Sequence, residues 1–106
     1  MTTFNSNAGG LIPLDDAVAL TQKFREDYPD AIKAHYFSKS VINDVLLQSE
    51  AVGIRIYNGI DNDGARQLIL VAVDIDGNDL YEGNLADMST PCPLICDENS
   101  PLCVTK

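Results

Sequence analysis

The 106-residue sequence has no tryptophan, one histidine and only seven basic residues against sixteen acidic ones, which gives a formal net charge of -9. After Asn58 the only basic residues are Arg66 and Lys106. A surface this poor in positive charge repels phosphate backbones and anionic lipid headgroups. We therefore expect neither nucleic acid nor a membrane surface as a partner.

The sequence also lacks a long hydrophobic run. No stretch approaches the ~18 apolar residues that a membrane-spanning helix needs. The first ten residues show neither the basic region nor the apolar segment of a secretory signal. Three cysteines are an odd number and do not make a complete disulfide framework. These features predict a cytoplasmic protein in a reducing compartment.

Three segments predict an antiparallel meander. Residues 52–57 alternate between two faces, as a half-buried strand does, and residues 67–74 include an unbroken apolar run, which is typical of a strand covered on both faces. A third strand is expected at about 79–83. Asn-Gly and Asp-Gly dipeptides separate the three segments and favour tight reversals of the chain.

Two helices are predicted, at about 14–28 and 40–48, because apolar residues recur there at helical spacing. Pro13 suits the start of the first helix, and Pro29 ends it. Ser38 or Ser40 caps the second. Residues 31–37 fit either a short edge strand or a helical continuation, and we favour the strand.

Together these elements predict one α+β domain, with two helices packed on one face of a three- to four-stranded antiparallel meander. Residues 1–12 are expected to form a flexible arm, residues 13–84 the α+β domain, and residues 85–106 an irregular tail rich in proline and cysteine. The expected core comprises Val18, Phe24, Ile42, Val45, Leu46, Ile54, Ile56, Val71 and Val73.

Several segments resemble a set of short uncharacterised bacterial proteins. They are Lys33–Phe37, Gly53–Tyr57, Leu70–Asp74 followed by Gly77–Asp79, and Cys92-Pro93 with Cys96. The resemblance implies a compact intracellular bacterial domain, and it brings no reaction, ligand or partner with it.

The cysteines are one candidate site. Cys92 and Cys96 have C-x3-C spacing, and with Cys103 and His35 they complete a set of three thiols and one imidazole that suits tetrahedral zinc. The usual zinc knuckle has C-x2-C spacing and a matched second pair, so we expect no stoichiometric zinc and no cofactor. Free thiols, a Cys92–Cys96 disulfide and thiol-redox activity are the alternatives.

Enzymatic catalysis has little support in the sequence. A Ser or Cys nucleophile would need His35 as its base and a carboxylate to orient it, and neither a nucleophile elbow nor a Gly-rich phosphate loop is found. The aspartates around residues 61–63 and 74–79 do not follow the EF-hand pattern and suit tight turns instead. The chain is therefore more consistent with a non-enzymatic protein.

A binding surface is the other candidate site. The central strand is apolar on both faces, whereas two short helices cover only one. The second face must meet the cysteine tail, the N-terminal arm or another chain, and of these we favour the tail. Arg55, Tyr57, Leu68 and Leu70 form the predicted interaction surface. The leading prediction is a small acidic binding domain for a protein partner or a weak homodimer, and the alternative is a zinc or thiol-redox protein.

Overall fold

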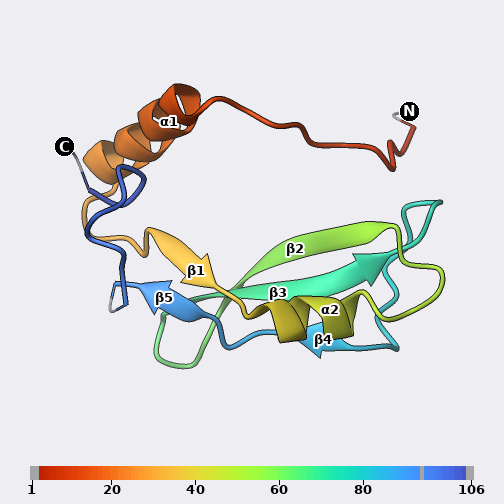
Figure 1. The fold of residues 1–106 in the computed structure, drawn as a ribbon. Coiled ribbons are helices and arrows are strands. Elements are labelled where there is room, and N and C mark those ends of the chain that lie inside the picture. Colours follow the sequence, from red (N-terminus) through yellow and green to blue (C-terminus); the bar gives the residue numbers. More distant parts are fainter. Residues whose placement is uncertain (1–2, 94, 105–106) are drawn as a thin grey trace. The chain divides into compact units, whose positions relative to one another are not determined.

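The computed structural model describes residues 3–93 and 95–104, which form two units (Figure 1). The first, here called the sheet unit, comprises residues 3–8 and 37–89. The second, here called the cysteine unit, comprises the described residues of 9–36 and 90–104. No helix of the described chain is long and apolar enough to cross a membrane.

The sheet unit contains the predicted antiparallel meander, with β2 (Gly53–Ile60), β3 (Arg66–Val73) and β4 (Leu85–Ala86) in the order β2-β3-β4 (Figure 1). The prediction of the first two strands is confirmed. The third strand begins later than the predicted residue 79, since Asp79 makes only an isolated bridge to Val73. The chain turns at residues 80–83 before it pairs regularly with β3.

Two turns of the sheet unit repeat one Asp-x-Asp-Gly pattern, at residues 61–64 and 74–77. In each turn, Oδ1 of the first aspartate accepts hydrogen bonds from the backbone N–H groups two and four residues later. The glycine has a positive φ, +83° at Gly64 and +88° at Gly77, which side chains other than hydrogen disfavour. The aspartates of these patterns therefore shape turns, as the sequence predicts.

Helix α2 (Lys39–Val45) begins at Ser38, whose Oγ accepts a hydrogen bond from the Val41 N–H. It is shorter than predicted. One face of the sheet packs against this helix, and Val45, Leu70 and Ala72 are almost fully buried there. Partly buried apolar side chains pack against this core, namely those of Phe37, Val41, Ile42, Ala51, Ile54, Leu68 and Leu80. Two residues of the expected core that belong to the sheet unit are exposed, Leu46 by 39% and Ile56 by 55%, because Leu46 follows the end of α2 and Ile56 lies on an edge strand.

The second face of the sheet meets the N-terminal segment. The register sets Arg55 opposite Val71, so their side chains share this face, and Val71 is only 3% exposed. The Phe4 ring lies 5.9 Å from the Arg55 guanidinium carbon and beside Gly77. Of the three coverings considered from the sequence, the N-terminal arm is the one found on this face within the sheet unit.

The cysteine unit contains helix α1 (Leu14–Asp27), as predicted, and a two-stranded antiparallel ribbon of β1 (Ala34–Tyr36) and β5 (Thr90–Cys92). The strand prediction for residues 31–37 is confirmed, but β1 pairs with β5 and does not extend the meander. The expected burial of Val18 and Phe24 is wrong, since no residue of α1 is buried.

The proline-rich tail is more regular than predicted, because it supplies β4 and β5. Pro91 lies within β5 and opposite His35. Proline is tolerated at sheet edges, and each strand of a two-stranded ribbon is an edge strand. The proline content of this segment therefore did not exclude a strand, although the sequence analysis had predicted an irregular tail from it.

Candidate functional site

Three cysteines meet in the cysteine unit, and backbone hydrogen bonds fix the first two. Cys92 is the last residue of β5, and its carbonyl oxygen accepts a 2.6 Å hydrogen bond from the Lys33 N–H, just before β1. The Ile95 N–H donates to the Pro91 carbonyl at 3.1 Å. This hydrogen bond lies beside Cys96, whose Cα atom is 4.9 Å from that of Cys92.

The third cysteine is held by a turn and by α1. The backbone N–H groups of Leu102 and Cys103 both donate to Ser100, at 3.1 Å, to its Oγ and to its carbonyl oxygen respectively. Arg25 of α1 donates from Nη1 to the Leu102 carbonyl at 2.8 Å. A hydrogen bond therefore links Leu102, the residue before Cys103, to a residue of α1 that lies 77 positions earlier in the chain.

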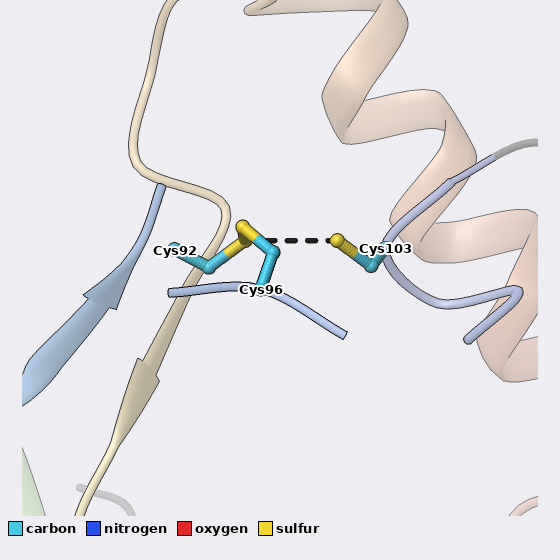
Figure 2. Close-up of side chains that lie close together, drawn as sticks. All are labelled: Cys92, Cys96 and Cys103. Carbon is cyan, nitrogen blue, oxygen red and sulfur yellow. Dashed lines mark hydrogen bonds between the residues drawn. A yellow bond between two sulfur atoms is a disulfide. The ribbon is translucent and has the colours of Figure 1, made fainter. Parts of the chain in front are cut away.

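The three sulfur atoms form a compact cluster (Figure 2). Cys92 and Cys96 are joined by a disulfide with a Cα–Cα distance of 4.9 Å, and Cys103 is a free thiol. The Sγ atoms of Cys103 and Cys92 are 3.6 Å apart, and all three Sγ atoms lie within 4.8 Å of one another. Cys92 is only 5% exposed, while Cys96 and Cys103 are half-buried. Of the alternatives drawn from the sequence, the structure shows the Cys92–Cys96 disulfide.

A pocket of about 270 Å3 adjoins the cluster. Its walls include all three cysteines, the apolar side chains of Ile95 and Leu102, and the charged residues Lys33 and Asp97. The half-buried thiol and disulfide are therefore reached through a small depression with both apolar and charged walls, not through a flat surface.

His35 lines the same pocket but does not join the sulfur cluster. The ribbon pairs Ala34 with Cys92 and His35 with Pro91. Since directly opposed residues share a face and neighbouring residues alternate, His35 and Cys92 point to opposite faces of the ribbon. Among the described residues, the group of converging metal-ligand atoms contains the three cysteines alone. Of the predicted set of three cysteines and one histidine, the structure brings the three cysteines together and leaves His35 outside their cluster. Partial burial lowers the pKa of His35 below its ordinary value of 6.5.

The sheet unit holds a second polar group, around Asp79. The Tyr57 hydroxyl donates a hydrogen bond to Oδ2 of Asp79, and Arg55 donates from Nη1 to Oδ1 of Asp79 and, at 3.1 Å, to the Gly77 carbonyl. The Tyr57 hydrogen bond and, to a smaller extent, that from Arg55 hold the pKa of Asp79 below its ordinary value. The same contact with Asp79 raises the pKa of Tyr57 and that of Arg55.

The predicted interaction surface is divided between the two faces of the sheet. Arg55 and Tyr57 share one face, whereas Leu68 and Leu70 lie on the other, because Leu70 is opposite Ile56 in the register. Leu70 is only 3% exposed and packs in the core beneath α2. The sequence did not identify Asp79 as the partner of Arg55 and Tyr57. Asp79 follows the turn at residues 74–77, and the sequence pattern indicated a role in that turn for every aspartate of the segment.

Comparison with known proteins adds no relative. No family model matches the chain, and neither a curated protein nor a solved structure matches it. The geometry of the cysteine cluster and of the sheet is therefore the basis for the proposals that follow.

Proposed function

We propose that this protein is a small thiol–disulfide redox protein whose chemistry is carried by Cys92, Cys96 and Cys103. The observation that carries the proposal is the position of a free thiol, Cys103, 3.6 Å from one sulfur of the Cys92–Cys96 disulfide. Thiol–disulfide exchange proceeds by attack of a thiolate on a disulfide sulfur, so a third cysteine beside a disulfide is the arrangement that this reaction needs.

The internal step is an exchange without net oxidation. The deprotonated Cys103 attacks Cys92 Sγ, the Cys92–Cys103 bond forms, and Cys96 leaves as a thiolate that takes up a proton. The external step is a two-electron exchange with a disulfide or dithiol of another protein. In it, the Cys92 and Cys96 thiols lose two electrons and two protons as their bond forms, and the partner disulfide is reduced to two thiols.

Exposure assigns different roles to the three sulfurs. Cys92 is 5% exposed and Cys96 is half-buried, so an external thiolate attacks the disulfide at Cys96 more readily than at Cys92, with Cys92 as the leaving thiolate. Cys103 in turn is the internal thiol nearest to Cys92. This arrangement lets the cluster exchange with a partner at its more accessible sulfurs and shift its own disulfide internally.

A redox titration tests the proposal. The full-length protein is equilibrated in glutathione buffers of defined potential, quenched with acid and alkylated, and its disulfides are mapped by mass spectrometry. We expect a single two-electron transition, with Cys92–Cys96 as the main oxidised species and Cys92–Cys103 as a minor one. In Cys103→Ser the first species should persist and the second should vanish.

An alanine substitution at an exposed serine, Ser49→Ala, provides a control for handling and alkylation and should behave as the wild type does. A protein that stays fully reduced across the whole range of glutathione potentials would contradict the proposal. A Cys92–Cys96 bond that glutathione never reduces in the folded protein would contradict it as well, because the disulfide would then be only a structural link.

A second function, self-association, is favoured by the edge strand β2. This strand is eight residues long, lies at the edge of the sheet and contains no acidic residue in a chain of net charge -9. Ile56 and Ile60 on this strand are 55% and 75% exposed. Long apolar edge strands pair readily with other strands, and the lack of acidic residues on this one keeps the charge repulsion between two copies of the strand low. We propose a homodimer that pairs β2 with β2.

The dimer is tested by light scattering during size-exclusion chromatography over a range of protein concentrations. Full-length protein should approach twice the monomer mass at high concentration. Ile56→Lys should shift it to monomer, because charged residues on an edge strand oppose pairing. Leu47→Lys, at a position that is 75% exposed outside the sheet, is the control and should leave association unchanged. A monomer at every concentration contradicts the dimer.

A further inference from the structure

The cysteine cluster has a second capacity, which arises when its disulfide is reduced. Three thiols then converge from β5, from the turn that follows it and from the turn held by α1. We propose that the reduced cluster binds one Zn2+ ion through Cys92, Cys96 and Cys103, with a fourth coordination position open to an external ligand. The proposal uses the site of the proposed redox function and requires its reduced form, but it does not require exchange with a partner.

The sulfur separations fit zinc. With Zn–S bonds of about 2.3 Å, tetrahedral geometry places two sulfur ligands about 3.8 Å apart. The Cys92 and Cys103 sulfurs are already 3.6 Å apart, and all three lie within 4.8 Å. Cys92 and Cys96 are covalently bonded in the disulfide, with their Cα atoms 4.9 Å apart. After reduction, a rotation of the two side chains opens the sulfurs to the spacing of zinc ligands with little movement of the backbone.

The donor atoms select the class of metal. Thiolates prefer Zn2+ and other thiophilic ions, whereas Mg2+ and Ca2+ prefer carboxylate and carbonyl oxygens. Asp97 lines the adjoining pocket, yet among the described residues the converging donors are the three sulfurs alone. The burial of Cys92 shields one thiolate from water, and Lys33 on the pocket wall offsets part of the negative charge of a three-thiolate site.

The open position follows from the register of the ribbon. His35 is the one histidine of the chain, and its place opposite Pro91 directs it to the face away from Cys92. Zinc sites with three protein ligands complete their coordination with water or with another molecule. The pocket of about 270 Å3 beside the sulfurs gives such a ligand, for example a thiolate, access to the metal.

Zinc binding and disulfide formation exclude each other. Binding to three thiols displaces up to three protons, because the thiolate is the ligand. Oxidation by a partner disulfide removes two electrons from Cys92 and Cys96, forms their bond, converts the oxidant to two thiols and leaves Cys103 as the single sulfur ligand. The ion is then released. The cluster therefore couples metal occupancy to the redox state of the chain.

The test begins with full-length protein reduced by a phosphine under nitrogen, titrated with Zn2+ and freed of excess metal on a desalting column. Elemental analysis should find one zinc per chain, and the melting temperature should rise with zinc concentration, since a ligand of the folded state stabilises it. Co2+ in place of zinc should give the intense near-ultraviolet and visible bands of a tetrahedral thiolate site. Added mercaptoethanol should shift these bands by occupying the open position.

The variants separate this three-cysteine site from the site with a histidine ligand that the sequence predicted. Cys103→Ser should weaken zinc binding by more than the roughly 10- to 100-fold that a change beyond the direct ligands costs. His35→Ala should keep one zinc and the same Co2+ spectrum. Circular dichroism and a thermal melt of each metal-free variant show that it is folded, so a loss of metal is assigned to the ligand.

Two results overturn the proposal. One is reduced wild-type protein that carries less than about a tenth of one zinc per chain after titration. The other is a site whose zinc is retained in Cys103→Ser. A normal redox transition without zinc binding overturns the metal site alone, and zinc binding to a protein that never forms Cys92–Cys96 overturns the redox function alone.

Discussion

Tyr57 and Asp79 are linked by a hydrogen bond from the tyrosine hydroxyl to Oδ2 of the carboxylate, which joins an edge strand of the sheet to the segment after its central strand. Arg55 binds the other oxygen of the same carboxylate. The two hydrogen bonds to this carboxylate lower the pKa of Asp79, and the bond from Tyr57 raises the pKa of the tyrosine. Asp79 therefore connects the protonation state of one carboxyl group to the stability of the sheet unit.

We expect Asp79→Asn to destabilise the protein at neutral pH and much less in acid. Because the pKa of Asp79 in the folded protein lies below its ordinary value of 3.8, its contribution is fully present above that value and is lost as the pH falls through the lower one. Urea unfolding of both proteins between pH 7 and pH 2 measures the difference. Glu82→Gln, a substitution of an exposed carboxylate in the same loop, is the control. A difference that stays constant over this range would contradict the prediction.

The sequence predicted the central part of the fold because its pattern there is strong. The unbroken apolar run of β3 requires cover on both faces, and Val71 and Val73 are indeed 3% exposed. The cover of the second face was harder to predict. Phe4 is a single aromatic residue in a polar segment, and its contact with Gly77 spans more than seventy residues, so no local periodicity signals it.

Val71→Asp should unfold the sheet unit. The side chain is 3% exposed, and an unpaired carboxylate at such a position costs several kcal/mol, against a total stability of about 5–15 kcal/mol for a typical domain. Leu47→Asp, at a position in the same unit that is 75% exposed and outside the sheet, should change the free energy of unfolding by only about 0.5 kcal/mol. Thermal melts followed by circular dichroism compare the two. A cooperative melt of Val71→Asp near the wild-type temperature would show that this face is not part of the core.

The candidate site was only partly predictable. The sequence identified the three cysteines, and C-x3-C spacing was enough to suggest a Cys92–Cys96 bond. It also included His35, which lies outside the group of three sulfurs, because composition shows which ligands exist but not which face of a ribbon they occupy. That face depends on the pairing of Ala34 with Cys92, a contact between segments 58 residues apart, and the proline in β5 hid this strand from pattern analysis.

Arg25→Met should make Cys103 more reactive. The guanidinium donates to the Leu102 carbonyl and so restrains the turn that carries the thiol. Removing the donor lets this turn open more often, and alkylation of Cys103 by N-ethylmaleimide at fixed pH should become several-fold faster. Lys23→Met removes an exposed ion pair with Asp27 on the same helix and should leave the rate unchanged. Equal rates in the wild type and Arg25→Met would show that the hydrogen bond does not restrain Cys103.

Gly77→Ala should destabilise the protein more than Gly64→Ala, although the two glycines occupy equivalent Asp-x-Asp-Gly turns. Both have a positive φ, so each alanine carries a similar backbone cost of about 1 kcal/mol. A Cβ at Gly64 meets open space, whereas one at Gly77 would lie 2.9 Å from the Phe4 ring and force it off the sheet. Urea unfolding gives both free energies. The extra cost at Gly77 should shrink in a Phe4→Ala background, because the two ring atoms nearest to the added Cβ are then absent. If the two substitutions cost the same in the wild-type background, Phe4 does not cover this face in solution.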